Sequence, residues 1–319
     1  MRVLVTGGTG FIGRWVVQRL IDSGHRVRVF DAHPNPAVLD ELSDQLSPQV
    51  EWAQGDMADG SVGEAVTDCD AVIHLAGLMT VDCARDPVRA AHINLMGTLH
   101  LMEAIRERGI RRFSYLSTAG VFGPDDAEHP KPMTHYGTQK LAIEGSARSY
   151  YLDHGIPSTG FRPYIVYGPG KSSGIAAGPS IALQAAARGD AATIQFSGRA
   201  GFVYVEDVAA LLVSAVAQPG EEAEVYNLCG ETTEMDRFVA QLLKRKPDAQ
   251  ISVKGAPLRI TPDLASDPLP ARLNHPTHTA LEAGIDRTLD FYARRSGDPA
   301  RDAGRHRSIA DKAVQKWEE

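Results

Sequence analysis

Tyr136 and Lys140 are four residues apart in a segment of helical periodicity, so their side chains share one face of the predicted helix. A tyrosine hydroxyl has an ordinary pKa of about 10, and a neighbouring ammonium favours the phenolate, so this pair could transfer a proton. Ser117 and Thr118 follow a predicted buried strand, at the end where open α/β sheets place ligands. A hydroxyl there could hold a substrate oxygen. Alone, the Tyr–Lys spacing also arises by chance, and the two hydroxyls could merely cap the next turn.

A glycine-rich segment, TGGTGFIG at Thr6–Gly13, lies between a predicted strand and a predicted helix. Gly7, Gly10 and Gly13 allow a tight turn, a close approach of the backbone to a diphosphate, and close packing of the helix on the strand. The helix N-terminus then offers unpaired N–H groups and a partial positive charge to the anion. The segment predicts a dinucleotide site, and a strand–helix turn without a ligand is the weaker alternative.

Asp31, at the end of the next predicted strand, indicates which dinucleotide the segment would bind. A carboxylate there accepts hydrogen bonds from the ribose hydroxyls of the adenosine and repels a 2′-phosphate. Ala32 and His33 follow, so no arginine is present to balance such a phosphate. The prediction is NAD rather than NADP, against the alternative that Asp31 is a solvated turn residue. An oxidised nicotinamide near Tyr136 would also favour its phenolate.

Short apolar strands alternate with helical stretches through the first half of the chain. Apolar strands separated by helices are typical of a doubly wound parallel sheet, so we expect an α/β, Rossmann-type fold. The predicted strands are Arg2–Thr6, Arg26–Phe30, Val50–Ala53, Ala71–Leu75, Phe113–Leu116 and Thr159–Phe161.

The second half has shorter elements interleaved with loops, so it is expected to form a smaller C-terminal substrate-binding lobe rather than an independent domain. We expect an NAD-binding domain over residues 1–165, which also takes in parts of 200–230. The substrate-binding lobe is expected mainly over 166–292, and a polar tail over 293–319.

The composition is that of an ordinary globular protein. The chain has 319 residues, of which 43% are hydrophobic and 23% charged, with a formal net charge of −7. A mildly acidic surface argues against nucleic acid or an anionic membrane as a partner, and no apolar run approaches the length that spans a bilayer. Cys69, Cys83 and Cys229 are scattered and odd in number, so they indicate neither a disulfide framework nor a CxxC metal motif. We expect a cytoplasmic protein.

A set of short segments spread along the chain forms a specific signature. Its members are TGGTGFIG, Asp31, Gly55–Asp56, His74–Gly77, Asn94 with Gly97–Thr98, Ser117–Gly123, Tyr136 with Lys140, Arg162–Gly170 and Phe202–Asp207. This signature resembles the extended short-chain dehydrogenase/reductases, also called the NAD-dependent epimerase/dehydratase family. The resemblance extends from Met1 to about Tyr292.

The resemblance implies a role for each matching residue. Hydride would pass between a substrate carbon and the nicotinamide, with Tyr136 as acid or base and Lys140 beside it. Thr118 takes the position of the family's catalytic Ser/Thr, and Ser117 directly precedes it. The resemblance places Asp56 and Met57 at the adenine, and it places Leu75, Ala76 and Gly77 at the adenosine ribose and phosphates. The other implied cofactor-binding residues are Gly7, Gly10, Phe11, Ile12, Gly13, Asp31, Asn94, Tyr136 and Lys140.

A helix predicted over Val88–Arg108 carries hydrophobic residues around most of its circumference. Such a helix is buried on more than one side, so one side faces the sheet and the other could pack on a second subunit. The resemblance points the same way, to a homodimer that joins this helix and the Tyr136 helix in a four-helix bundle. Cover by the chain's own loops is the alternative, because periodicity does not locate the covering surface.

Three further signals are interpreted as structural. His275 and His278 have a metal-ligand spacing, but they lie in a proline-rich segment without a plausible third ligand, so we predict a solvated loop and no metal site. His74 ends a buried strand and is predicted to be packed and hydrogen-bonded. Lys171 lies in a Gly/Ser loop, Gly168–Gly178, that lacks P-loop spacing but could border the substrate.

Two positions bear on the kind of substrate. By the resemblance, family members that act on nucleotide sugars usually carry an Asn at the position of Ile165 and an Arg at that of Ala200. Both hold the substrate's diphosphate, which needs donors and positive charge. Isoleucine and alanine provide neither, although Arg199 is adjacent and could substitute.

The sequence therefore predicts an NAD-dependent oxidoreductase for a secondary alcohol or ketone of a small non-nucleotide substrate, such as a sugar, sugar acid or hydroxy acid. Met79, Thr80 and Thr118 are expected to contact it, together with Ile165 and Arg199. One alternative is a nucleotide-sugar epimerase or dehydratase with tightly bound NAD. A remote one is a non-catalytic NAD-sensing regulator, which would need the glycine loop but not the acid–base residues.

Overall fold

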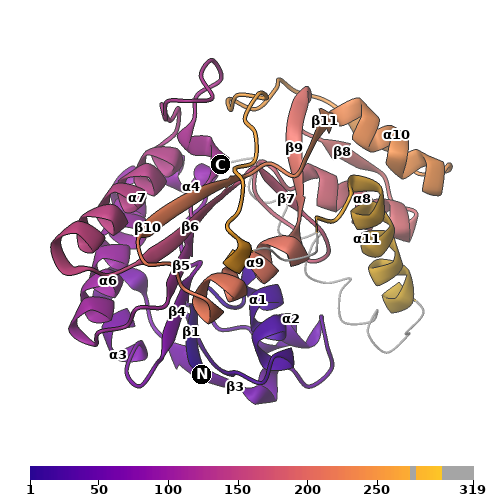
Figure 1. Ribbon diagram of the computed structural model, residues 1–319. Helices are drawn as coiled ribbons and strands as arrows, with labels where there is room; N and C mark the ends of the chain where they lie inside the picture. The colour runs from indigo at the N-terminus through magenta and orange to yellow at the C-terminus, as the bar shows by residue number, and fades with distance from the viewer. Residues whose placement is uncertain (274–277, 297–319) are drawn as a thin grey trace.

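The computed structural model describes residues 1–273 and 278–296 of the chain. Its centre is a parallel seven-stranded sheet in the order β10-β6-β5-β4-β1-β2-β3 (Figure 1). The strands are β1 (Arg2–Thr6), β2 (Arg26–Asp31), β3 (Val50–Gln54), β4 (Ala71–His74), β5 (Phe113–Leu116), β6 (Ser158–Pro163) and β10 (Ala223–Leu228). All six strands predicted from the sequence lie in this sheet, and the Rossmann-type fold is confirmed.

Helices cover both faces of this sheet. They are α1 (Phe11–Asp22), α2 (Pro36–Asp40), α3 (Val62–Ala65), α4 (Thr80–Arg85), α5 (Pro87–Ala91), α6 (Gly97–Glu107), α7 (His135–His154) and α9 (Val205–Ala217). α1 packs against α9 on one face, whereas α6 and α7 pack together on the other, at the left of Figure 1.

Alternating side chains of the strands build an apolar layer on each face. On β1, Val3 and Val5 pack into a cluster with α1 and α9, whereas Leu4 between them packs into a cluster with α3, α6 and α7. All three side chains are fully buried. A strand buried on both faces needs apolar residues at consecutive positions, which is why these strands are recognisable as unbroken apolar runs.

The helix predicted over Val88–Arg108 is divided in the structure. A π-helical turn, His92–Met96, separates α5 from α6. Such turns are frequent at functional sites because they locally re-aim side chains. Asn94, in the middle of this one, is buried and bonds to the backbone of the loop that follows β4.

The C-terminal lobe contains a small sheet in the order β11-β9-β7 and a pair of strands, β12 and β8. Its elements are β7 (Ile165–Tyr167), α8 (Gly178–Arg188), β8 (Ala192–Ile194), β9 (Arg199–Tyr204), β11 (Glu231–Glu234), α10 (Met235–Arg245), β12 (Ile251–Val253) and α11 (Leu281–Ser296). Residues 297–319 of the predicted polar tail lie outside the described residues.

The lobe closes over the carboxyl ends of the central strands. Trp15 of α1 donates its indole N–H to the carbonyl of Pro169 at 3.2 Å, and the N–H of Thr261 donates to the carbonyl of Gly123 at 2.9 Å. Residues that follow β1 and β5 are thus tied directly to the lobe. Within residues 1–273 and 278–296, no helix has both the length and the apolar character needed to cross a membrane.

Candidate active site

The glycine loop after β1 presents bare backbone at the start of α1. Gly7 has a φ of +69°, in the left-handed region that favours glycine, and its N–H donates to the carbonyl of Phe30 at 2.8 Å. A Cβ at Gly13 would overlap the carbonyl oxygen of Gly7, so the helix packs directly on the loop. Gly10 caps α1 without a side-chain hydrogen bond. The N–H groups of the first turn, which starts at Phe11, are therefore free of side-chain caps, and this surface fits a dinucleotide diphosphate.

Asp31 ends β2 beside this loop and is held by it. Its Oδ2 accepts a hydrogen bond from the hydroxyl of Thr9 at 2.6 Å, and its Oδ1 accepts from the N–H of His33 at 3.2 Å. The carboxylate is only partly buried and keeps lone pairs for further donors. Its position and remaining acceptors fit the two hydroxyls of an adenosine ribose.

A chain of hydrogen bonds behind the loop after β4 fixes the protonation of His74. The hydroxyl of Thr98 donates to the carbonyl of Asn94 at 2.5 Å, so its oxygen accepts from His74 Nε2 at 2.9 Å. His74 Nδ1 then carries the lone pair and accepts from the hydroxyl of Thr6 at 2.7 Å. The Thr6 oxygen in turn accepts from the N–H of Leu75 at 3.1 Å. The neutral ring is the packed, hydrogen-bonded histidine predicted from the sequence.

We expect acid to destabilise the protein through His74. Burial, with a smaller contribution from the charge of Lys140, lowers the pKa of His74 from 6.5 to about 3. Between these values the unfolded chain binds the proton and the folded chain does not, so stability falls as the pH decreases, by at most about 1.4 kcal/mol per pH unit. In His74→Gln, the free energy of unfolding measured with urea should depend less steeply on pH between about pH 6.5 and about pH 4.5. His100→Gln, which changes an exposed histidine of α6, should retain the steeper dependence. An unchanged slope in His74→Gln would contradict the assignment.

Asn94 and Gln139 join the loop after β4 to helix α7. Asn94 Oδ1 accepts from the N–H of Leu78 at 2.7 Å, and Asn94 Nδ2 donates to Gln139 Oε1 at 2.8 Å. The fully buried thiol of Cys83 lies 3.7 Å from the same Gln139 oxygen. Gln139 directly precedes Lys140, so this buried network helps to fix the position of that lysine.

Tyr136 and Lys140 lie on the first turns of α7. The helix starts where it does because the hydroxyl of Thr134 accepts from the N–H of Gly137 at 3.0 Å. Lys140 is 4% exposed, and its Nζ lies 5.9 Å from the ring centroid of Tyr136. Burial lowers the pKa of Lys140 to about 8, and burial, with a smaller contribution from Cys83, raises the pKa of Tyr136. The chain by itself thus favours the neutral phenol, so the shift toward phenolate expected from the sequence requires the charge of the oxidised cofactor.

The adjacent hydroxyls of Ser117 and Thr118 have different partners. Thr118 Oγ1 accepts from the N–H of Gly120 at 3.0 Å and caps the 3-10 turn Ala119–Val121. Its proton therefore remains available for a substrate oxygen. Ser117 is 3% exposed and donates to Glu144, whose carboxylate pairs with Arg162 at 2.5 Å. The structure thus places Ser117 in a buried ion-pair network and leaves Thr118 as the hydroxyl able to bind a substrate.

The sequence analysis did not identify Glu144 or Gln139, and it named Arg162 only as the first residue of a signature segment, without a role. Glu144 follows Lys140 by one helical turn on the same face, and this spacing could have placed it beside the site. Arg162 comes from β6 and forms two bonds with Glu144, at 2.8 Å and 2.5 Å. That contact joins a strand to a helix, and local spacing does not predict it.

Several other candidate residues line the carboxyl ends of β3 and β4. Asp56 accepts a backbone N–H at 2.9 Å and caps the 3-10 turn that starts at Met57. Met57 packs in the core, so any contact with a cofactor would use its backbone or the edge of its side chain. Gly77 and Met79 are exposed, and Thr80 is partly exposed at the start of α4. These three residues follow the carboxyl end of β4 and are accessible to a ligand bound there.

Ile165 and Ala200 do not have the polar surroundings of an anion site. Each is 1% exposed and packs in the apolar core of the C-terminal lobe. Arg199 forms an ion pair at the surface with Asp263, at 3.0 Å. The structure therefore does not bring these three residues together as a polar group.

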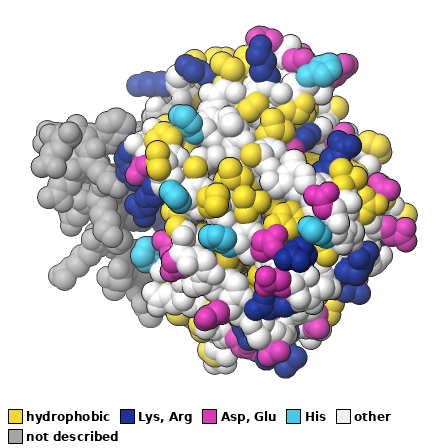
Figure 2. Space-filling view, turned by 90° about the vertical axis from the view of Figure 1, so that its left-hand side faces the viewer, with side chains coloured by type: hydrophobic (Ala, Val, Ile, Leu, Met, Phe, Trp, Pro, Cys, Tyr) yellow, Lys and Arg dark blue, Asp and Glu magenta, His cyan; other side chains and the backbone are white. Residues whose placement is uncertain are grey.

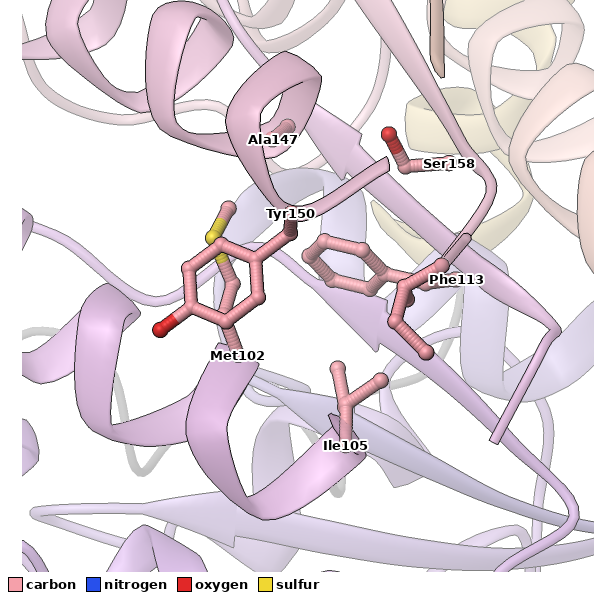
Figure 3. A pocket seen from close by; sticks show the side chains of 7 residues that line it. Met102, Ile105, Phe113, Ala147, Tyr150 and Ser158 are labelled. Atoms are coloured by element: carbon pink, nitrogen blue, oxygen red, sulfur yellow. The ribbon is translucent and has the colours of Figure 1, made fainter. Parts of the chain in front are cut away.

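A small apolar pocket lies between α6 and α7, away from the candidate site (Figure 3). It is lined by Met102, Ile105, Phe113, Ala147, Tyr150, Ile156 and Ser158. Its cavity volume is about 10 Å³, which is room for about one water molecule and far below the range of about 300–1,000 Å³ that is usual for ligand pockets. Tyr150 lies about four helical turns from Tyr136, and its hydroxyl points away from the pocket toward Glu103. This pocket is a packing gap between two helices.

Metal-binding features were also predicted to be absent. His275 lies outside the described residues, so its pairing with His278 has no structural description. In the described part of the chain, no group of three His, Cys, Asp or Glu residues could hold a metal ion. The three cysteines are buried free thiols.

The sequence matches a known family over most of its length. A model of the NAD dependent epimerase/dehydratase family matches residues 3–229. The chain is 31% identical over 224 residues to a putative UDP-glucose 4-epimerase of Methanocaldococcus jannaschii, covering 65% of this chain and 70% of that one. It is also 31% identical over 260 residues to a dTDP-D-glucose 4,6-dehydratase of Mus musculus, covering 76% and 71%. The crystal structure of the Thermus thermophilus UDP-glucose 4-epimerase in complex with NAD matches with a TM-score of 0.76 and 26% identity, over 93% of this chain and 100% of that one.

Proposed function

Because the chain belongs to the NAD-dependent epimerase/dehydratase family, and is therefore an enzyme whose cofactor is NAD, we propose that it transfers hydride between NAD and a secondary alcohol carbon of a sugar. The observation that carries this proposal is the Tyr136–Lys140 pair at the start of α7, with the hydroxyl of Thr118 available at the end of β5. A redox sensor without turnover would have no use for this pair.

Tyr136 acts as the acid or base for the substrate oxygen. The Thr118 hydroxyl donates to that oxygen and orients it, and Tyr136 removes its proton as the alcohol is oxidised. When bound, NAD supplies the nicotinamide ring that accepts the hydride and can return it. The buried ammonium of Lys140 stabilises the phenolate and bonds the cofactor ribose.

We propose nucleotide-sugar epimerisation as the first candidate reaction. The names of both curated relatives refer to nucleotide-linked glucose, and they favour this alternative over the non-nucleotide substrate predicted from the sequence. Epimerisation needs the hydride to return to the opposite face of the carbonyl. Dehydration would need a further acid and base beside Thr118, where Ala119, Gly120 and Val121 have no titratable side chain.

A net dehydrogenase for a non-nucleotide sugar or sugar acid is the second candidate. The burial of Ile165 and Ala200 among apolar side chains favours it, as does the pairing of Arg199 with Asp263. An epimerase must retain its keto intermediate until the hydride returns. These positions provide little positive charge to anchor that intermediate by a diphosphate.

Calorimetric titration of the NAD complex with UDP, GDP and dTDP, followed by turnover assays, tests these proposals. The epimerase candidate predicts saturable binding of one nucleotide and formation of an epimer without net NADH. The dehydrogenase candidate predicts no such binding, and NADH formation with a sugar or sugar acid. Binding of NAD without formation of an epimer or NADH from any nucleotide sugar, sugar or sugar acid tested would contradict hydride transfer.

Asp31→Ala is expected to narrow the preference of the protein for NAD over NADP. The carboxylate, held by Thr9 and His33, would bond the ribose hydroxyls of NAD and repel the phosphate of NADP. Loss of a charge-assisted hydrogen bond should weaken NAD binding about tenfold or more. Fluorescence titration with both cofactors measures this. Asp22→Ala, at the exposed far end of α1, is the control, and equal affinities of the unmodified protein for both cofactors would argue against the role of Asp31.

We also propose a homodimer formed through the outer face of α5, α6 and α7. Val88, Met96 and Leu152 are exposed on these helices and the π turn between them. Figure 2, which turns this side of the molecule to the viewer, shows hydrophobic side chains gathered near its centre. Sedimentation equilibrium of the purified protein, with Leu152→Glu as the variant, tests this surface, and a monomer at all concentrations would exclude it.

A further inference from the structure

The loop after β7 packs against the helix that begins at the glycine loop. Gly170 has a φ of +95°, and a Cβ there would lie 2.8 Å from the guanidinium of Arg14 on α1. Trp15 of the same helix bonds to the carbonyl of Pro169. This approach places Lys171, the next residue of the loop, beside the first turn of α1.

The ammonium of Lys171 faces this turn without an ion-pair partner among the described residues. Its Nζ donates to the carbonyl of Val166 at 2.9 Å and lies 5.3 Å from the ring centroid of Phe11. Arg14, by contrast, pairs with Glu41 at 3.2 Å. An ammonium has three N–H donors, so Lys171 retains donors beyond the bond to Val166.

Two positive features therefore meet at the same place. Phe11 begins α1, whose N-terminus carries a partial positive charge, and the Lys171 ammonium lies over its ring. Burial lowers the pKa of Lys171 to about 8, as expected for a charge that lacks a counter-ion. An anion between the lobe and the glycine loop would compensate both charges.

We propose that Lys171 binds the diphosphate of the dinucleotide from the side of the C-terminal lobe, opposite the glycine loop. This inference rests on the proposed assignment of the glycine loop as the NAD site. It gives the loop after β7 a role in binding and in closing the lobe over the cofactor. The aliphatic part of the Lys171 side chain packs on Phe11, and the ammonium binds the diphosphate.

Calorimetric titration with ADP-ribose tests this role without any substrate or turnover. Lys171→Met retains the packing on Phe11 and removes the charge, so we expect ADP-ribose affinity to fall about tenfold. Lys171→Arg retains the charge and should bind within about threefold of the unmodified protein. Adenosine, which has no phosphate, should bind equally to all forms. Lys254→Met, which removes an exposed lysine of the lobe, is the control for net charge.

Two outcomes would overturn the proposal. Unchanged ADP-ribose affinity in Lys171→Met, with a lower melting temperature, would mean that Lys171 only fastens the loop to α1. If Lys171→Met bound UDP more weakly but ADP-ribose with unchanged affinity, the ammonium would instead lie at the substrate site. If Lys171→Met does not fold, Lys171→Gln retains a donor for Val166 and allows the same comparison. Because ADP-ribose has no nicotinamide, failure of the proposed hydride transfer would leave this result unchanged.

Discussion

Tyr136→Phe is expected to lower turnover by about 10²- to 10⁴-fold, the usual contribution of a general acid–base group. The ring would still pack beside Lys140, whose Nζ lies 5.9 Å from its centroid, and only the proton carrier is lost. The affinity for NAD should therefore change little. Steady-state assays with the substrate identified by the turnover assays, together with cofactor titration, separate the two effects.

Tyr151→Phe is the matched control for this experiment. Tyr151 is a partly buried tyrosine of the same helix, about four turns away from Tyr136. It should retain full turnover, because its hydroxyl lies far from the start of the helix. If Tyr136→Phe also retained nearly full turnover, then Tyr136 would not be the acid or base, and a different proton carrier would have to be sought.

The fold was predictable because its signals are local. The strands are short apolar runs, and the position of Gly7, with its left-handed φ of +69°, allows essentially only glycine. Asp31 lies at the end of the strand that follows, where the chain direction of a βαβ unit requires it. Each of these features depends on residues near one another in the sequence, so the spacing of those residues was sufficient to predict it.

The partners of the candidate site were harder to predict because they come from distant segments. Ser117 appeared equivalent to Thr118 in the sequence, yet it bonds to Glu144 of α7, which pairs with Arg162 of β6. The π turn at Asn94 interrupts a helix whose apolar pattern appeared continuous. Tertiary hydrogen bonds decided both cases, and neither helical nor strand periodicity contains them.

The buried pair of Glu144 and Arg162 should therefore contribute strongly to stability. Arg162→Met is expected to destabilise the protein by about 3–5 kcal/mol, because it leaves the carboxylate of Glu144 buried with the hydroxyl of Ser117 as its main remaining donor. The side chain of Glu144 is 6% exposed, so water replaces little of the lost contact. Urea unfolding at neutral pH measures the change. Arg111→Met, which removes an exposed arginine before β5, is the control.

The double variant Arg162→Met/Glu144→Leu distinguishes a specific pair from general sensitivity of this region. Replacing both charges with apolar side chains removes the uncompensated carboxylate, so the double variant should be more stable than Arg162→Met alone. If the double variant lost as much unfolding free energy as Arg162→Met and Glu144→Leu lose together, the two side chains would act independently. Burial lowers the pKa of Lys140, and Cys83 and, to a smaller extent, Glu144, which follows Lys140 by one turn, raise it. The double variant should therefore recover stability, whereas its turnover should be slightly lower than that of Arg162→Met, which keeps the carboxylate beside this lysine.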